Sequence, residues 1–163
     1  MQALTQTAPR HRRTATNKPF AANPLQRCGW LDFPAMHDTR GNLSFIENFR
    51  HIPFGMERIY FLYDIPCMAE RAGHAHCDLV QVFISMSGSF DLHLDDGTEK
   101  RTVHLCRANR GYLVQPWTWR TLDNFSGSSV CLVLASLPYD EADYIRGFPE
   151  FKQLAAQRAR LRP

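Results

Sequence analysis

The sequence lacks the features that mark several specialised classes of protein. No apolar run approaches the ~20 residues that a transmembrane helix needs, and no hydrophobic segment of the secretory type opens the chain. The formal net charge is only +3, and part of it lies at the two ends of the chain, so no dedicated nucleic-acid surface is indicated. We therefore expect a cytoplasmic protein that binds neither membrane nor nucleic acid.

The cysteines also lack the pattern of a disulfide framework or a zinc site. They number five, which is odd, and no two are arranged as Cys-x-x-Cys. We predict that they are free thiols in a reducing compartment. They are Cys28, Cys67, Cys77, Cys106 and Cys131.

What is present is an ordinary globular composition with many aromatic residues. Of the 163 residues, 44% are hydrophobic and 21% are charged, and eleven are Phe. These aromatics, together with ten prolines and nine glycines, favour an all-β body. Residues 1–26 carry no acid and predict a basic, flexible tail, although a transit peptide has a similar composition. Residues 27–163 are expected to form a single domain.

Short alternating segments separated by turn signals predict about nine strands, followed by two helices. This order indicates a β-sandwich or barrel of the jelly-roll type. An immunoglobulin-like sandwich is the alternative, but it gives no reason for a His-x-His pair on an inner wall. Residues 66–71 are expected to form a loop that leads to the strand of the two histidines, which runs on into the β-rich stretch 77–86. The other strands are expected at 43–47, 57–64, 89–94, 99–105, 112–115, 117–122 and 130–136, with 51–54 extended, and the helices at 140–146 and 149–161.

The stretch with the most chemical content contains His74 and His76. Residues two apart on a strand point to the same face, so the two imidazole rings should lie side by side. Such a pair has three interpretations that the spacing alone leaves open, namely metal ligands, an acid/base pair or structural histidines.

The residues around this pair match a known pattern. Gly73, His74, His76, Gln81 and Gly88 are spaced like the first cupin motif, with glutamine where many cupins have glutamate. More specifically, the chain resembles the dTDP-4-keto-6-deoxyglucose 3,4-ketoisomerases, small cupins of deoxysugar biosynthesis. The other matches, in chain order, are Arg40-Gly41-x-Leu43, Ile52-Pro53-Phe54, Arg58-x-Tyr60, Arg71, Leu94-Asp95-Asp96-Gly97, Pro116-x-x-Trp119, Val133-Leu134-Ala135-Ser136 and Tyr139-Asp140-Glu141-x-Asp143-Tyr144-Ile145-Arg146.

The resemblance implies a fold and a reaction. The fold is an all-β cupin jelly roll (a double-stranded β-helix) with a short C-terminal helical tail, in a homodimer that often exchanges strands. The reaction moves a ketone from C4 to C3 of a dTDP-linked hexose through an enediol, in the synthesis of deoxyaminosugars for surface polysaccharides such as the lipopolysaccharide O-antigen. It needs no redox cofactor, because the overall oxidation level of the sugar is unchanged.

The resemblance also implies roles for particular residues. His74 and His76 would serve as acid and base, since imidazole titrates near pH 7, and no metal is expected. Tyr60 would hydrogen-bond the sugar or steady a histidine. Substrate binding would fall to a set of polar residues, with Arg40 and Arg71 on the diphosphate because guanidinium groups match phosphate oxygens. The full set is Arg40, Arg58, Arg71, Gln81 and Arg120.

Arg120 departs from the family pattern. Members usually carry a histidine directly after the tryptophan of Pro-x-x-Trp, where this chain has Arg120. The arginine would stabilise an enediolate or fill the space of the missing histidine. The departure leaves as an alternative a non-catalytic cupin that binds a nucleotide sugar. A metal-dependent cupin enzyme is the other alternative, and Arg120 weighs against it because a cupin metal site usually draws its last histidine from this position.

Overall fold

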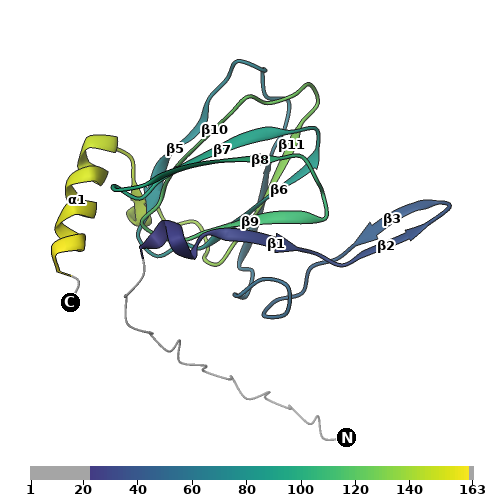
Figure 1. The fold of residues 1–163 in the computed structure, drawn as a ribbon, viewed down its shortest axis with the longest axis horizontal. Helices are drawn as coiled ribbons and strands as arrows, with labels where there is room; N and C mark the ends of the chain where they lie inside the picture. The colour runs from purple at the N-terminus through teal and green to yellow at the C-terminus, as the bar shows by residue number, and fades with distance from the viewer. Residues whose placement is uncertain (1–22, 162–163) are drawn as a thin grey trace, which may run out of the picture.

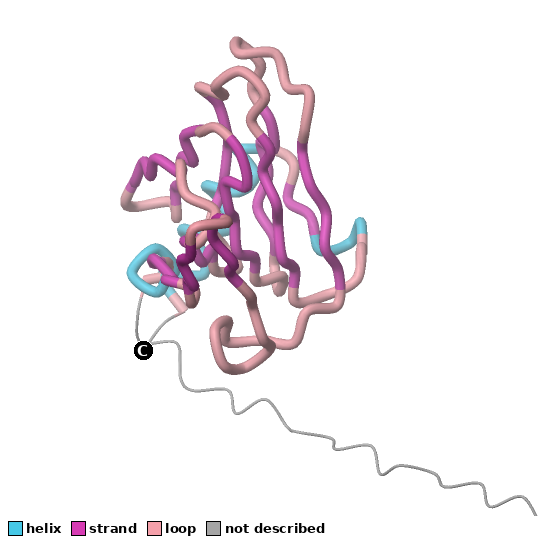
Figure 2. The backbone as a smooth tube through the Cα atoms, turned by 90° about the vertical axis from the view of Figure 1, so that its right-hand side faces the viewer, coloured by secondary structure: helices cyan, strands magenta, loops and turns pink. Residues whose placement is uncertain are grey.

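The computed structural model describes residues 23–161, and it shows twelve strands in three antiparallel sheets. Two five-stranded sheets, ordered β1-β9-β6-β11-β4 and β12-β5-β10-β7-β8, form the body (Figures 1 and 2). The all-β jelly-roll prediction is confirmed. The strands are β1 (Gly29–Asp32), β2 (Ala35–Asp38), β3 (Gly41–Ser44), β4 (Arg58–Leu62), β5 (Arg71–His76), β6 (Gln81–Ser87), β7 (Phe90–Asp95), β8 (Lys100–Leu105), β9 (Arg110–Val114), β10 (Trp119–Asp123), β11 (Val130–Ala135) and β12 (Tyr144–Ile145).

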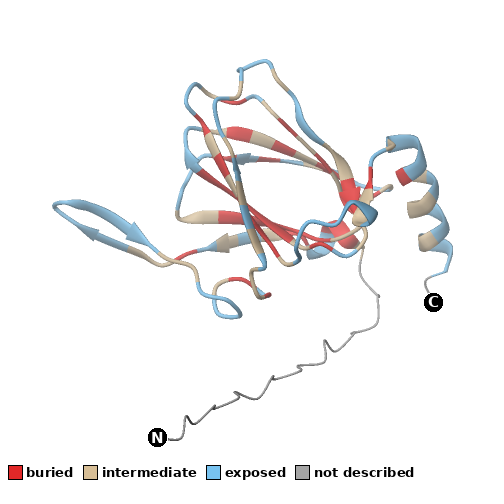
Figure 3. Ribbon diagram, turned by 180° about the vertical axis from the view of Figure 1, so that it is seen from behind, coloured by how far each residue is buried: buried red, intermediate tan, exposed pale blue. Residues whose placement is uncertain are grey.

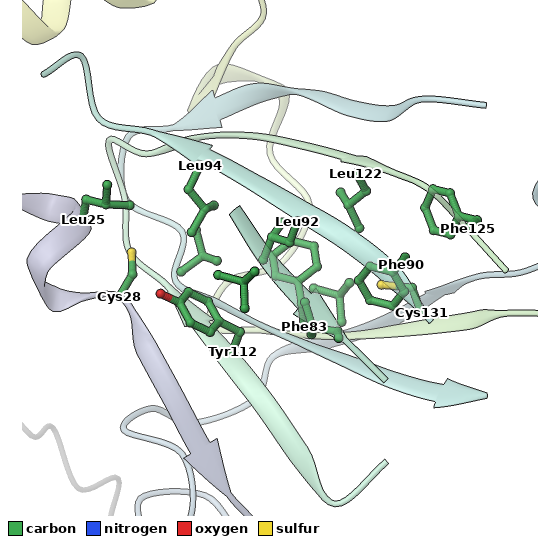
Figure 4. Packing of buried hydrophobic residues seen from close by; sticks show 14 residues of the cluster. Leu25, Cys28, Phe83, Phe90, Leu92, Leu94, Tyr112, Leu122, Phe125 and Cys131 are labelled. Carbon is green, nitrogen blue, oxygen red and sulfur yellow. The ribbon is translucent and has the colours of Figure 1, made fainter. Parts of the chain in front are cut away.

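The main hydrophobic core fills the space between the two large sheets (Figure 4). Phe83 and Val133 from one sheet pack against Phe90, Leu92 and Leu122 from the other. These side chains come from alternate positions of their strands, because successive residues of a strand point to opposite faces. The sequence pattern therefore gives each of the two sheets an apolar inner face.

A second apolar cluster covers the outer face of the first sheet. Val82, Ile84 and Leu134 point outward there and are covered by Ile52 and Phe54 from the segment between β3 and β4. Strand β11 is consequently buried on both faces, as its continuous apolar run predicts. Strands β1 and β2 were not predicted, since their few residues show no clear alternation.

Of the two helices predicted for the C-terminal segment, one forms and one does not. A helix does form at α1 (Phe148–Arg160), and Phe151 buries its ring against Ala75 and Ile145. The helix expected at 140–146 is wrong. Only a short 3₁₀ turn, η2 (Glu141–Asp143), occurs there, and β12 follows it and pairs with β5. The open edge of β5 offers backbone partners to 144–145, which outweigh a helix too short to be stable alone.

The β2–β3 hairpin projects away from the body and is almost wholly exposed (Figures 1 and 3). At the other end of β1, the 3₁₀ turn η1 (Pro24–Arg27) buries Leu25 in the main core. The predicted tail thus lies mostly outside the described residues, and the folded body begins a little before residue 27.

Two predictions about composition can be compared with the described chain. All five cysteines are free thiols, and Cys28 and Cys131 are buried. Within residues 23–161, no helix has both the length and the apolar character that crossing a membrane requires.

Candidate active site

A cavity of about 570 Å³ opens between the two large sheets, at the end of the sandwich that the main core leaves free. Strands β4 and β6 of one sheet and β5 and β10 of the other supply most of its wall, and the segment around η2 and β12 closes one side. The lining residues are Arg58, Tyr60, Leu62, Glu70, Arg71, Ala72, His74, Phe83, Arg120, Leu122, Tyr139, Tyr144 and Arg146.

A β-bulge places His74 on this wall. His74 pairs with Arg120 across β5 and β10, but the next pair joins Ala72 to Thr121, so Gly73 is left without a partner. Ala72 and Gly73 both have a left-handed backbone, with φ of 69° and 71°. That conformation costs an L-residue about 1–2 kcal/mol, while glycine adopts it freely. Such bulges re-aim a side chain, and here the bulge directly precedes His74.

The two histidines lie side by side, as the strand spacing predicts. Their ring centroids are 4.8 Å apart with the planes at 88°. Their surroundings differ, however, because His74 lines the cavity, whereas His76 is fully buried and does not. The Tyr144 ring packs against both, with centroids 4.9 Å from His74 and 4.2 Å from His76.

His76 is held by a carboxylate that comes from far along the chain. Its Nδ1 is hydrogen-bonded to Oδ2 of Asp143 at 2.8 Å, and Oδ1 of Asp143 accepts the backbone N–H of Asp78 at 2.7 Å. The other ring nitrogen of His76, Nε2, is buried and has no hydrogen-bond partner within residues 23–161. Asp143 was not among the predicted site residues, since its segment was assigned to a helix.

Tyr60 and Gln81 form a hydrogen-bonded pair across β4 and β6. The Nε2 amide of Gln81 donates to the Tyr60 hydroxyl oxygen at 2.8 Å. Burial raises the pKa of the Tyr60 phenol to about 12, so the phenol keeps its proton at neutral pH. Because its oxygen already accepts the Gln81 amide, the Tyr60 O–H remains available to donate into the cavity.

Arg120 brings a positive charge into the interior. It is fully buried, and none of its guanidinium nitrogens has a hydrogen-bond partner in the described part of the chain. Burial lowers the pKa of Arg120 to about 10, which leaves it charged at neutral pH. Burial first, and the Arg120 charge second, lower the pKa of His74 to about 4. His74 is therefore neutral at pH 7 and able to accept a proton.

Three further arginines surround the cavity. Arg58 lies 5.4 Å from the centre of the Tyr60 ring, and Arg71 stands where β5 begins. Arg146 makes two hydrogen bonds to Glu141, of 2.7 and 2.8 Å, and lies 4.3 Å from the centre of the Tyr144 ring. A cavity with this excess of positive charge suits an anionic ligand.

The structure brings together most of the predicted site. Tyr60, Arg58, Arg71, His74 and Arg120 line the cavity. His76 and Gln81 do not line the cavity, but each contacts a residue that does. His76 packs against the His74 ring, and Gln81 donates a hydrogen bond to Tyr60. Arg40 is the exception, because it lies at the turn of the β2–β3 hairpin, 88% exposed, in a 2.6 Å ion pair with Asp38.

Several wall residues were not predicted. Glu70, Tyr139, Tyr144 and Arg146 reach the cavity from loops or from the short elements after β11. For the last three, the one signal in the sequence was membership of the matched segment 139–146. Among residues 23–161, no group of three or more His, Cys, Asp or Glu side chains is arranged to hold a metal ion.

Comparison with known proteins identifies the family to which the chain belongs. The family described as "FdtA: WxcM-like, C-terminal" matches residues 26–156. A curated relative, the TDP-4-oxo-6-deoxy-alpha-D-glucose-3,4-oxoisomerase of Aneurinibacillus thermoaerophilus, is 38% identical over 127 residues, which are 78% of this chain and 91% of the relative.

Solved structures show the same relationship. The sugar 3,4-ketoisomerase QdtA of Thermoanaerobacterium thermosaccharolyticum, solved in complex with TDP, superposes with a TM-score of 0.80 at 33% identity, over 82% of this chain and 98% of that one. A 3,4-ketoisomerase from Helicobacter canadensis is 40% identical, with a TM-score of 0.78 over 80% of this chain and 98% of that one. This chain therefore belongs to the FdtA-type, WxcM-like C-terminal family of sugar 3,4-ketoisomerases.

Proposed function

We propose that the protein moves the keto group of dTDP-4-keto-6-deoxyglucose from C4 to C3. The observation that carries this proposal is the cavity in which a neutral histidine, a protonated tyrosine and a buried arginine meet, with further arginines around it. Relatives named as 3,4-ketoisomerases, one of them solved with TDP, support the choice of reaction and of nucleotide.

His74 is the group that moves the carbon-bound proton. It alone of the two paired histidines lines the cavity, and its lowered pKa keeps the ring neutral. The imidazole takes the proton from C3 and returns it to C4. C3 and C4 are adjacent in the sugar ring, so one base on one face of the ring can reach both.

Tyr60 and Arg120 act on the sugar oxygen atoms: Tyr60 on O4 and O3, and Arg120 on O4. As the C3 proton leaves, negative charge develops on O4, and both the Tyr60 O–H and the Arg120 guanidinium favour it. The Tyr60 phenol gives its proton to O4 and recovers one from the hydroxyl at O3, so that the ketone ends at C3. Arg120 opposes the charge of a protonated His74, but the enediolate formed at the same moment offsets that repulsion.

Arg71 and Arg58 bind the diphosphate. Each guanidinium presents a fork of N–H donors that matches two phosphate oxygens. Gln81 contributes indirectly, since it orients the Tyr60 hydroxyl.

Reduction of the reaction mixture with borodeuteride tests the proposed function. Borodeuteride places deuterium on whichever carbon carries the ketone, so the unreacted substrate is labelled at C4. Incubation of dTDP-4-keto-6-deoxyglucose with the protein should add a label at C3. No C3 label above that of a protein-free control would reject the proposal.

A non-catalytic cupin that binds a nucleotide sugar is the second candidate, and Arg120 is the observation that favours it. The arginine directly follows Trp119, the position at which the resemblance to the ketoisomerases leads us to expect a histidine. Calorimetry that gives micromolar or tighter binding of dTDP, combined with no C3 label, would favour this alternative.

We also propose that the protein is a homodimer that exchanges its β2–β3 hairpin. Arg40 is expected to bind the diphosphate, yet in its own subunit the hairpin projects away from the body (Figure 1). The outer face of edge strand β4 exposes Ile59 and Phe61 by 55% and 58%, an apolar surface that a second copy would cover. Dimer formation would then bring Arg40 to the partner's cavity.

Mixing two inactive variants tests this exchange. Arg40→Ala and His74→Asn, each impaired alone, are refolded together. If Arg40 acts across the dimer, the mixed species regains one complete site, made of His74 from one subunit and Arg40 from the other. No recovery of activity in a mixture shown to contain heterodimers would place Arg40 within its own subunit or outside the site.

The reaction also suggests a place in metabolism. A ketone at C3 is the group that a transaminase converts to an amine, which fits the synthesis of deoxyaminosugars for surface polysaccharides such as the O-antigen. Free thiols and a nucleotide-linked substrate fit a location in the cytoplasm.

A further inference from the structure

Asp143 makes contacts that the proposed reaction does not use. Its two carboxylate oxygens accept from two different groups, Nδ1 of His76 at 2.8 Å and the backbone N–H of Asp78 at 2.7 Å. Its backbone carbonyl accepts a third hydrogen bond, from the N–H of Cys77 at 3.0 Å. One residue thus fixes three consecutive positions at the end of the histidine strand.

The side chain at position 143 decides the direction of the bond to His76. The backbone N–H of Asp78 is a fixed donor, so the oxygen that faces it must be an acceptor. An ionised carboxylate leaves its second oxygen also as an acceptor, and the His76 nitrogen opposite must then carry a proton. Asp143 therefore selects the tautomer of His76 with hydrogen on Nδ1 and a lone pair on Nε2.

The His76 ring in turn supports the ring of His74. The two centroids are 4.8 Å apart in an edge-to-face arrangement, and Tyr144 packs against both rings. His76 is fully buried, so it meets no ligand in the cavity directly. Burial, and then the charge of Arg120, lower the pKa of His76, which keeps this buried ring neutral.

We infer that Asp143 and His76 are a positioning pair, in which Asp143 fixes the tautomer and angle of His76 and the His76 ring holds His74 in place for proton transfer. Two adjacent histidines therefore have different tasks, and only His74 carries the proton. The inference rests on the proposed function, because the group being positioned is the proposed base.

The Asp143→Asn variant tests the first half of the pair. The introduced side-chain amide keeps one acceptor oxygen for the N–H of Asp78 and turns its NH₂ toward His76, so Nδ1 must become an acceptor and the proton must move to Nε2. We expect ¹⁵N NMR of the ring nitrogens to show this switch. We expect kcat to fall about 10–100-fold, as a small displacement of a catalytic group does, while KM changes less than about 3-fold.

The matched control is Asp78→Asn. Asp78 is exposed and adjacent to the same strand, and the change removes one negative charge there while its backbone N–H still meets Asp143. We expect kcat and the His76 tautomer to remain as in the unmodified protein. An equal loss of kcat in both variants would assign the effect to charge and overturn the inference.

Other outcomes of the Asp143→Asn experiment are also decisive. A tautomer switch with kcat within about 2-fold of the unmodified protein would show that His76 does not position His74. A loss of kcat without a switch would show that Asp143 does not act through the tautomer. Because the NMR spectrum needs no substrate, a protein without any turnover would reject the proposed function while the spectrum still decides the tautomer.

His76→Gln separates positioning from proton transfer, and it serves equally if Asp143→Asn fails to fold. The glutamine amide can still donate to Asp143, but it lacks the ring that packs on His74. We expect about a 10-fold loss of kcat. A loss as large as that of His74→Asn, about 10³-fold, would make His76 a proton carrier and overturn the inference.

Discussion

The interior of the sandwich has an apolar half, the main core, and a polar half, the cavity wall. Both are built on the same strands but have different functions. On β10, Leu122 belongs to the main core and forms the apolar boundary of the cavity, while Arg120, two residues earlier on the same face, brings a charge to the cavity wall. On β6, Phe83 likewise belongs to the core and borders the cavity, while Gln81 donates a hydrogen bond to Tyr60. The alternation continues along each strand, and only the type of inward residue changes.

This difference separates stability from chemistry. The apolar half gains free energy from burying its side chains. The polar half instead buries an arginine and a histidine nitrogen for which the described chain supplies no hydrogen-bond partner. Such groups oppose folding, and an enzyme keeps them where they favour a charge that develops during the reaction.

The largest expected effect concerns the polar half alone. His74→Asn should lower kcat about 10³-fold, because a positioned acid or base contributes about 10²–10⁴ in rate. The melting temperature and the Kd for dTDP should stay close to those of the unmodified protein. Steady-state kinetics, thermal unfolding and calorimetry check these expectations, and a variant with substantial activity would remove His74 from the mechanism.

Arg120→Met should separate the two halves most clearly. We expect kcat to fall about 10²-fold, because a preorganised charge beside the enediolate is lost. We expect the free energy of unfolding to rise by about 1–3 kcal/mol, since a buried charge without hydrogen bonds gives way to an apolar chain. Urea unfolding measures the second quantity, and a clear loss of stability would mean that Arg120 is well compensated in the folded state.

Leu92→Ala should do the opposite. Leu92 is fully buried between the sheets and does not line the cavity, so its truncation should lower the free energy of unfolding by about 2–5 kcal/mol. At a temperature where the variant is folded, its kcat should remain within about 2-fold. A large loss of kcat in the folded variant would show that the two halves are coupled.

The smallest effect is a shift in titration. The pKa of His74 is lowered to about 4, so the ring becomes charged only well below neutral pH. The activity should therefore persist as the pH falls through 6 and decline toward 4. The unfolded chain binds its proton near pH 6.5, so this histidine also makes the folded state less stable as the pH falls between those values. An NMR titration of His74 checks the value, and a pKa near 6.5 would contradict it.

Most of the fold could be predicted from the sequence because most strands have a recognisable local pattern. Alternating apolar residues and turn signals located β4 to β11, and the pair of histidines two residues apart was correctly expected on one face. The segment 140–146 failed for the opposite reason. Its acids and its length fit a helix, but the decisive influence was the free edge of β5, which is distant in sequence.

By itself, the sequence determined the strand alternation, the family motif and the chemical types gathered around His74. Only the tertiary structure decided which of those groups work together. The bulge at Gly73 that aims His74, the carboxylate that Asp143 brings to His76 across 67 positions, and the exclusion of Arg40 from its own cavity all depend on contacts between distant segments. Residue types and local periodicity can be seen in the sequence itself, whereas burial and hydrogen-bond partners arise only when separate strands come together.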